Sequence, residues 1–202
     1  MTRPVAPRPW NEFDTLTSGQ DYRHVVFDGL ALDHEDLADC TFEGCSFVHA
    51  DLTGTRMNAA VFRNCNLSHA RVAGCNFFAT SFEGCKLLGV DFQNGVTLTG
   101  AAFTSCNLNY AAFRGVSLAR MEWRDCSFVE ADFSLTDLTR ASFVNCDLTR
   151  VDIQDATFLQ TDVRGANLTG WNLKHHDLQG IIITPAQFDA LATELGILIL
   201  AG

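Results

Sequence analysis

Large apolar residues recur at every fifth position through most of the chain. The series begins at Tyr22 and continues to Phe92; after one extra residue it resumes at Leu98 and runs to Ile183. Two positions before each large residue stands a smaller one, usually Ala, Cys, Val or Thr. Residues two apart in a strand point to the same face. Each large residue and its small neighbour are therefore predicted to be buried together, with a polar residue between them facing outward.

Glycine, asparagine and other turn formers most often stand two positions after the large residue. In a straight strand the next large residue, five positions on, would point to the opposite face. The chain must bend once in each unit to keep all of them inside, and Gly or Asn permits that bend. A period of five also drifts from the 3.6 residues of a helical turn, which excludes an α-helix. The pattern predicts short strands joined by corners.

A second period, of about twenty residues, indicates how many strands complete one coil. Two series keep this spacing, and these are Cys45, Cys65, Cys85, Cys106, Cys126 and Cys146, and Tyr22, Phe42, Phe62, Phe82, Phe103, Trp123 and Phe143. Four short sides per coil would stack like residues over like. We expect an all-β solenoid of about eight coils over residues 20–183, with a one-residue slip near Gly95. An extra residue makes a bulge and a local bend, although a tolerated insertion fits the period equally well.

The units CNLSH, ADLTG, VDFQN, ADFSL, TDLTR and ANLTG resemble the A(D/N)LXX signature of pentapeptide-repeat proteins. That resemblance covers residues 20–183 and implies a right-handed quadrilateral β-helix. The stretch CKLLGVDF, the slip in the middle of the rod and the C-terminal tail are similar to the Qnr and MfpA class. This class binds DNA gyrase and topoisomerase IV as a DNA mimic, carries a discontinuity near its middle and dimerises through a C-terminal module, so the resemblance implies these properties.

Different patterns flank the repeats at both ends. Residues 1–19 carry three of the four prolines and are interpreted as a flexible arm. Residues 184–202 are expected to form a helix and a strand. Thr184 is a suitable N-cap, Pro185 suits the first helical position, and Gln187 completes a capping box.

The expected helix has one apolar stripe, which could cover the open last coil or form a twofold interface. The two uses are compatible. The residues assigned to dimerisation are Phe188, Leu191, Leu195, Ile197, Leu198 and Ile199.

The formal net charge is −10. An acidic protein of this size is not expected to bind nucleic acid directly, and it suits a basic partner. No signal peptide is recognised in the first twenty residues, and no apolar run approaches a membrane span. We therefore expect a cytoplasmic protein, in which the eight cysteines stay reduced.

The cysteines do not resemble a chemical site. They form no CxxC pair, and an inward position beside alanines offers a nucleophile neither a base nor exposure. Disulfides between coils are disfavoured by compartment and by parallel side-chain directions. His49 and His69 are expected to stack at outward corners, and nothing orients them in a catalytic triad. We expect no metal, no cofactor and no enzymatic activity, and interpret the cysteines as small core residues.

Charge differs between the sides of the expected solenoid. One side is predicted to be acidic and to bind the partner, through Asp33, Asp51, Asp91, Asp132, Asp152 and Asp155, diluted by Arg71, Arg114 and Lys174. Another side alternates Glu43, Arg63 and Glu83, which is typical of pairing between coils. These aspartates could also have no binding role, because Asp is a solubilising residue that tolerates turns.

Two functions remain open. By resemblance, the chain is a dimeric DNA mimic of gyrase or topoisomerase IV that moderates the enzyme or protects it from poisons such as fluoroquinolones or a self-made antibiotic. Alternatively, it is a pentapeptide-repeat scaffold for another protein partner. Many Qnr proteins carry long loops that matter for drug protection, whereas no insertion here exceeds one residue, so the chain is closer to the MfpA type.

Overall fold

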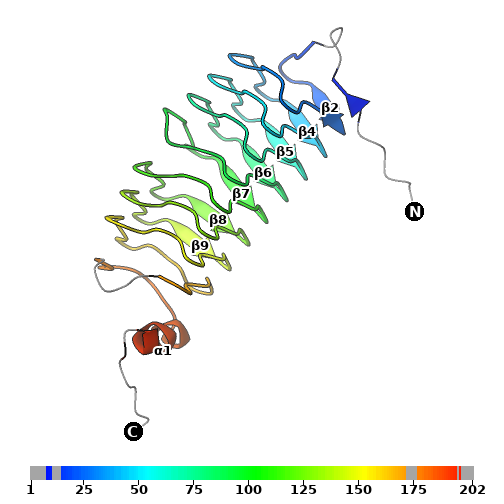
Figure 1. Ribbon diagram of the computed structural model, residues 1–202. Coiled ribbons are helices and arrows are strands. Elements are labelled where there is room, and N and C mark those ends of the chain that lie inside the picture. The colour runs from blue at the N-terminus through cyan, green and yellow to red at the C-terminus, as the bar shows by residue number, and fades with distance from the viewer. Residues whose placement is uncertain (1–7, 11–14, 172–176, 195, 197–202) are drawn as a thin grey trace, which may run out of the picture.

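The protein is a rod of stacked coils in a computed structural model that describes residues 8–10, 15–171, 177–194 and 196 (Figure 1). The predicted all-β solenoid with a short C-terminal helix is confirmed. Seven parallel strands, one from each of seven successive coils, form a single sheet in the order β2-β4-β5-β6-β7-β8-β9. These strands are β2 (Asp21–Arg23), β4 (Thr41–Glu43), β5 (Val61–Arg63), β6 (Ser81–Glu83), β7 (Ala102–Thr104), β8 (Glu122–Arg124) and β9 (Ser142–Val144).

Each coil has four sides, which are named here by their order along the chain. In one coil they pair with the next through Phe42↔Phe62 on the first side, Ser46↔Asn66 on the second, Asp51↔Arg71 on the third and Arg56↔Asn76 on the fourth. All of these pairings are parallel. Bridges from Ser142 to Asp162 and from Asp162 to Ile182 continue the first side beyond β9. The four-sided coil predicted from the two periods is confirmed.

The corners take a left-handed backbone conformation, as the turn formers two positions after each large residue predict. Gly44 and Gly54 have φ of 62° and 68°. Many corners are not glycine, however, and Ala59, Tyr110 and Leu135 also have positive φ. Left-handed φ is uncommon outside glycine, so stacking of the coils imposes it on these residues.

The core is a continuous stack of the large residues. Phe42, Phe62, Phe82 and Phe103 are buried and lie one above another, with ring centroids 4.7–4.9 Å apart. Trp123 continues the stack at 4.4 Å from Phe103. Such offset stacks add to the burial of apolar surface, which is the main force holding the coils together.

The N-terminal segment differs from the expected flexible arm. Its described part includes β1 (Arg8–Pro9), which pairs in parallel with β3 (Val25–Val26). The indole of Trp10 lies 5.1 Å from the ring of Phe27, measured between centroids. This segment is therefore attached to the first coil.

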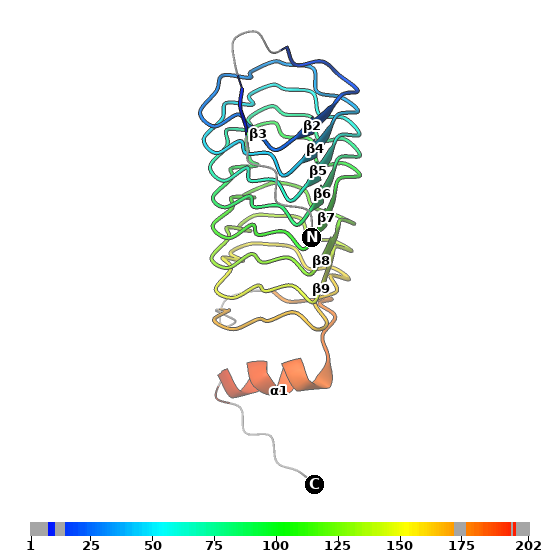
Figure 2. The ribbon, with the colours of Figure 1, turned by 90° about the vertical axis from the view of Figure 1, so that its right-hand side faces the viewer.

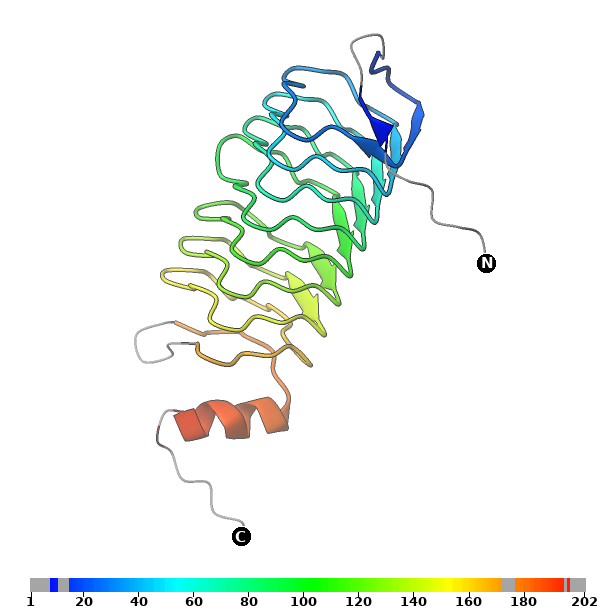
Figure 3. The same ribbon diagram turned by 45° about the vertical axis from the view of Figure 1, so that its right-hand side comes forward.

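The slip changes the pairing between coils on the fourth side. Gly95 occupies the corner with φ of 73°, and the strands across the slip pair with a shift of 21 residues, as Phe82 does with Phe103. One coil later no bridge joins Thr97 to Ser117, although both continue the stack away from this level, through Asn76↔Thr97 and Ser117↔Asp137. Figures 1 and 3 show the wider spacing of the green loops that follow β6 and β7.

The helix α1 (Pro185–Glu194) lies across the C-terminal end of the stack (Figure 2). The predicted capping box is present: the Thr184 N–H donates to Gln187 Oε1 at 2.9 Å, and the Gln187 N–H donates to Thr184 Oγ1 at 3.2 Å. No helix in the described part of the chain is long and apolar enough to cross a membrane.

Candidate protein-interaction face

The third side of the rod brings four of the predicted aspartates into one outward column. Parallel bridges connect the members of this aspartate column in the order Ala31, Asp51, Arg71, Asp91, Ala112, Asp132, Asp152. Asp132 and Asp152 lie on adjacent coils, whereas Arg71 separates Asp51 from Asp91. The carboxylates are therefore aligned along the rod but interrupted by one positive charge and one alanine.

The other two predicted residues lie beside the column. Asp33 directly follows the buried Leu32 and is exposed. Asp155 stands at a corner with φ of 56° and is also exposed. Both add negative charge to the third side without joining the stacked positions.

The aspartates of the column also hold the turns that follow them. In each case Oδ1 accepts a hydrogen bond from the backbone N–H two residues later, and these distances are 3.1 Å for Asp51, 2.8 Å for Asp91, 2.8 Å for Asp132 and 3.0 Å for Asp152. This is the Asx turn, in which the side chain replaces a backbone acceptor. From the sequence these residues were expected to bind a partner, to aid solubility and to tolerate turns, and the Asx bond was not predicted.

The arginines reduce the charge unevenly along the column. Arg71 Nη1 lies 3.3 Å from Asp51 Oδ2, and the bonds from Thr53, with this arginine, lower the pKa of Asp51. Arg114 donates to Ser134 Oγ at 2.7 Å, and Ser134 Oγ in turn donates to Asp132 Oδ1 at 2.5 Å.

Within the described residues, Oδ2 of Asp132 and Oδ2 of Asp152 have no hydrogen bond or ion pair. The carboxylates of the third side that have no ion pair within the described residues are therefore found mainly between Asp91 and Asp155.

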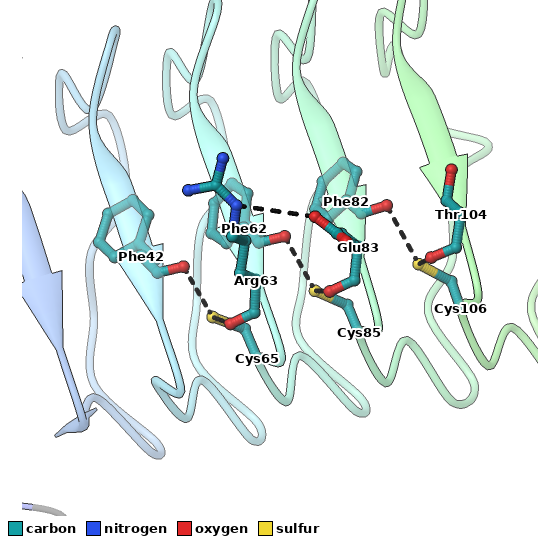
Figure 4. Close-up of polar contacts among 9 residues, drawn as sticks. All are labelled: Phe42, Phe62, Arg63, Cys65, Phe82, Glu83, Cys85, Thr104 and Cys106. Atoms are coloured by element: carbon teal, nitrogen blue, oxygen red, sulfur yellow. Dashed lines mark hydrogen bonds and ion pairs between the residues drawn. The ribbon is translucent and has the colours of Figure 1, made fainter.

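Charges on the first side are paired, as the alternation of signs predicts. Arg23 lies 3.4 Å from Glu43 of the next coil. Arg63 likewise lies 3.6 Å from Glu83 of the next coil (Figure 4). Arg124 differs, because its partner is Glu122 of the same strand. This side offers fewer free carboxylates to a basic partner than the third side.

The cysteines are buried and free, and they also make hydrogen bonds that the sequence analysis missed. The thiol of Cys65 donates to the Phe42 carbonyl of the preceding coil at 3.4 Å, and Cys85 donates likewise to Phe62 at 3.3 Å (Figure 4). Thr55 on the fourth side and Thr80 on the first side also stand two residues before a large residue, and their hydroxyls donate to a carbonyl of the preceding coil. Threonine at this inward position could have predicted the bonds from the sequence, because a buried hydroxyl requires a hydrogen-bond acceptor.

Burial keeps all eight thiols away from solvent. Burial raises the pKa of Cys75 to about 12, which disfavours the nucleophilic thiolate. In the described part of the chain, no group of three or more His, Cys, Asp or Glu side chains could hold a metal ion. His49 and His69 stack at the corners with centroids 5.2 Å apart, as expected.

The apolar stripe of α1 is only partly buried. Leu191 and Ala192 are buried, whereas Phe188 is 55% exposed. Gln187 Nε2 donates to the carbonyls of Val163 and Ala166 at 2.7 and 2.8 Å. The helix therefore covers the end of the solenoid, and Phe188 is left on its outer surface. The other predicted dimerisation residues, Leu195, Ile197, Leu198 and Ile199, lie outside the described residues.

Solved structures with the same fold include QnrB1, a plasmid-mediated fluoroquinolone resistance protein. Full-length QnrB1 has a TM-score of 0.82 at 23% identity, over 89% of this chain and 92% of QnrB1. A trypsin-treated form has a TM-score of 0.83 at 23% identity, over 91% of both chains.

A further match is HetL, involved in heterocyst differentiation regulation in the cyanobacterium Nostoc sp. strain PCC 7120. It has a TM-score of 0.62 at 22% identity, over 83% of this chain and 86% of HetL. At these identities the likeness establishes the fold. No curated protein sequence matches the chain significantly.

Family models cover almost the whole solenoid. The pentapeptide repeat region model matches residues 20–92 and 75–153, and the model of eight pentapeptide repeats matches residues 146–184. These matches agree with the five-residue units, the four-sided coils and the corners of the structure, and the chain belongs to the pentapeptide-repeat family.

Proposed function

We propose that this protein binds DNA gyrase and topoisomerase IV in place of DNA, as a homodimer, and thereby moderates the enzyme or protects it from poisons such as fluoroquinolones. The aspartate column is the observation that carries the proposal. Its free carboxylate oxygens are aligned along one side of a rod, where a basic DNA-binding surface could meet them. QnrB1, a fluoroquinolone resistance protein, has the same fold, which supports a role in protection from such poisons.

The mechanism is competition for the DNA-binding surface of the enzyme. Asp91, Asp132 and Asp152 stand in for phosphates, and Asp51 contributes less because Arg71 is bound to it. Electrostatic complementarity of this kind mainly raises the association rate and weakens as salt is added. Inhibition is therefore expected to fall as the salt concentration rises.

A supercoiling assay with purified gyrase, with and without a fluoroquinolone, tests the proposal. We expect the protein to inhibit supercoiling and to reduce drug-induced DNA cleavage. If neither effect is seen at tens of micromolar protein, a concentration about 100-fold above the Kd of a sub-micromolar complex, the proposal fails.

The Asx turns permit a matched test of the face. The triple variant Asp91→Asn, Asp132→Asn, Asp152→Asn removes three charges and keeps the side-chain acceptor of each turn. The control Asp137→Asn, Asp147→Asn, Asp177→Asn does the same at Asx turns on other sides. We expect the first variant to raise the inhibitory concentration about tenfold, which corresponds to about 1.4 kcal/mol, and the control to change it less than about twofold. Equal effects of both variants would show that net charge, rather than this face, decides binding.

The alternative is a scaffold for a different protein partner. It predicts a folded, stable protein that leaves gyrase activity unchanged in the same assay. The two functions are therefore separated by one experiment on the wild-type chain.

A further inference from the structure

On the fourth side, no bridge joins Thr97, in the coil that carries the slip, to Ser117 in the coil that follows it. At the preceding coil the Phe77 N–H donates to the Thr97 carbonyl at 2.9 Å, and the Ala102 N–H donates to the Thr80 carbonyl at 2.9 Å. The equivalent bonds one coil later are absent from the described residues. The N–H groups that would donate these bonds, those of Leu98, Gly100, Ser117 and Glu122, have no hydrogen bond within the described residues.

The carbonyl groups opposite these N–H groups are also without a hydrogen bond in that part of the chain. They belong to Val96, Ala101, Ser117 and Ala119, and none of them accepts a bond from the described residues. Along the first edge the free groups follow the order acceptor, donor, donor, acceptor, and along the second edge each free group faces its complement. The rungs on either side are intact, since Asp91 pairs with Ala112 and Phe103 pairs with Trp123.

The interruption forms a cleft of about 810 Å³. Small side chains, among them Thr97, Thr99, Ser117 and Ala119, make up much of its lining, and the larger Gln93, Arg120 and Glu122 also contribute to it. Val96 and Met121 add apolar surface to the lining. On the next coil toward the N-terminus, Phe78 is 49% exposed, and its neighbour Ala79 donates to the Thr99 carbonyl at 3.1 Å.

The extra residue explains why the cleft is at this level. Gly74 donates to the Asn94 carbonyl at 2.7 Å, so the chain entering the slip remains bound to the preceding coil. Gly95 then donates to the Gln93 carbonyl at 3.0 Å within its own loop, and does not reach the following coil. Residues 96–101 stay with the preceding coil, while the next coil keeps its regular spacing.

We propose that the cleft binds an extended peptide segment of a partner protein, which inserts between the two coils as an added strand. Free backbone donors and acceptors on two parallel edges can bond to another extended backbone. Residues 96–101 span one side of the solenoid, so the inserted segment is about five residues long. Small or apolar side chains suit the lining near Val96 and Val116, and an aromatic or aliphatic residue beside the strand contacts Phe78.

This site is separate from the proposed gyrase face. The cleft lies on the fourth side, and the aspartate column lies on the third. The inference therefore stands whether or not the protein binds gyrase.

A phage-displayed library of random 12-residue peptides provides a defined probe. Peptides selected on the wild-type protein are synthesised, and their Kd is compared with that for two variants. Deletion of Gly95 restores the regular unit and places Asn94 at the corner, as Asn64 and Asn145 are at theirs. Ala119→Arg fills the mouth of the cleft, and Thr139→Arg is its matched control in the same column, where the coils are bonded.

We expect selected peptides to lose at least tenfold in affinity for the Gly95 deletion and for Ala119→Arg, and to retain it for Thr139→Arg. Methylation of alternate peptide nitrogens should abolish binding, because it removes the strand donors. Bound peptide should also slow amide exchange at Leu98, Gly100 and Ser117. Circular dichroism of each variant checks that it is folded.

Three results would overturn the proposal: no enriched peptide that depends on the cleft, equal binding of the N-methylated peptide, or unchanged amide exchange at the free N–H groups. Self-association of the wild type that the Gly95 deletion abolishes, in the absence of peptide, would instead assign the cleft to a second copy of this chain.

Discussion

At the scale of single residues, the repeat imposes backbone conformations that most side chains avoid. Ala59 has φ of 56° at an exposed corner. A left-handed conformation costs an L-residue about 1–2 kcal/mol, and no described corner with positive φ carries Val, Ile or Thr, in which branching at Cβ makes it less favourable still. Stacking tolerates this cost because each corner is held by bonds to the next coil, such as that from Ala59 N–H to the Phe78 carbonyl.

Replacement of Ala59 tests this account. Ala59→Gly should raise the free energy of unfolding by about 0.5–1 kcal/mol, since relief of strain exceeds the entropy that glycine loses, and Ala59→Val should lower it by more than about 1 kcal/mol. Ala73, which lies outside the positive-φ corners, is the control: Ala73→Gly should lower stability by about 0.5–1 kcal/mol. Urea unfolding measures all three, and the same sign at both alanines would contradict the account.

The Asx turns and ion pairs give stability a dependence on pH. The Arg56 guanidinium lowers the pKa of Asp36, and bonds from Thr53 lower the pKa of Asp51. A carboxylate with a depressed folded pKa stabilises the protein above its unfolded pKa of about 3.9, and the contribution is lost as pH falls through the folded value. Stability should therefore decrease as pH falls below about 4.

Melting temperatures measured from pH 7 to pH 2 test this expectation. Asp51→Asn keeps an acceptor for the turn but does not titrate, so its melting temperature should fall less steeply in acid than that of the wild type. Asp33→Asn is the control, because no hydrogen bond within the described residues reaches the Asp33 carboxylate. If the melting temperature of the wild type stays constant or rises as the pH falls, the predicted loss of stability in acid is wrong.

At the scale of elements, α1 acts as a cover for the last coils. The side chain of Gln187 satisfies two carbonyls at the end of the stack and also completes the N-terminal capping box. Leu191 is buried at the same end. A solenoid without such a cover would expose an apolar core and unpaired backbone groups.

Removal of the Gln187 amide should weaken this end of the rod. Gln187→Ala leaves the Ala166 carbonyl without a donor and the Val163 carbonyl with only the Ala166 N–H, which costs about 1–3 kcal/mol and should speed amide exchange at Val163 and Asn167. The exposed Gln179→Ala is the matched control and should change neither quantity. If amide exchange at Val163 and Asn167 is as slow in both variants as in the wild type, α1 does not stabilise the terminal coils.

At the scale of the whole molecule, shape and charge set the terms of binding. Seven stacked strands at about 4.8 Å give a sheet of roughly 30 Å, and the whole solenoid is about 40 Å long. The net charge of −10 then corresponds to about one charge per 4 Å, compared with about one per 1.7 Å in duplex DNA. Mimicry would therefore depend on the alignment of carboxylates along one side, and a dimer would double the length of that side.

The proposed dimer depends on the outer surface of α1. Leu191→Asp would disturb the cover of the last coil, so it cannot isolate an interface. Phe188→Asp changes an exposed residue and should convert a dimer into a monomer of 22.2 kDa. Phe78→Asp, at a similarly exposed phenylalanine on the side of the rod, should leave the dimer intact. Sedimentation equilibrium measures both, and a wild-type monomer or a dimeric Phe188→Asp variant would refute this interface.

The sequence by itself determined the four sides, the corners, the stacked aromatic and cysteine series and the capped C-terminal helix. It could do so because each repeat contacts only its neighbours, so that local periodicity carries the tertiary arrangement. The periods of five and twenty residues therefore predicted which of Phe42, Phe62 and Phe82 would stack, and placed Asp51, Asp91, Asp132 and Asp152 on one side.

Only the tertiary structure decided how individual atoms pair between coils. It showed that each thiol faces a carbonyl, that one oxygen of each column aspartate is used in a turn, and that Phe188 and Leu191 of one stripe have different surroundings. It also placed the open rung one coil after Gly95, between Thr97 and Ser117. These features depend on the register and separation of neighbouring coils, which a one-residue slip shifts by an amount that periodicity does not specify.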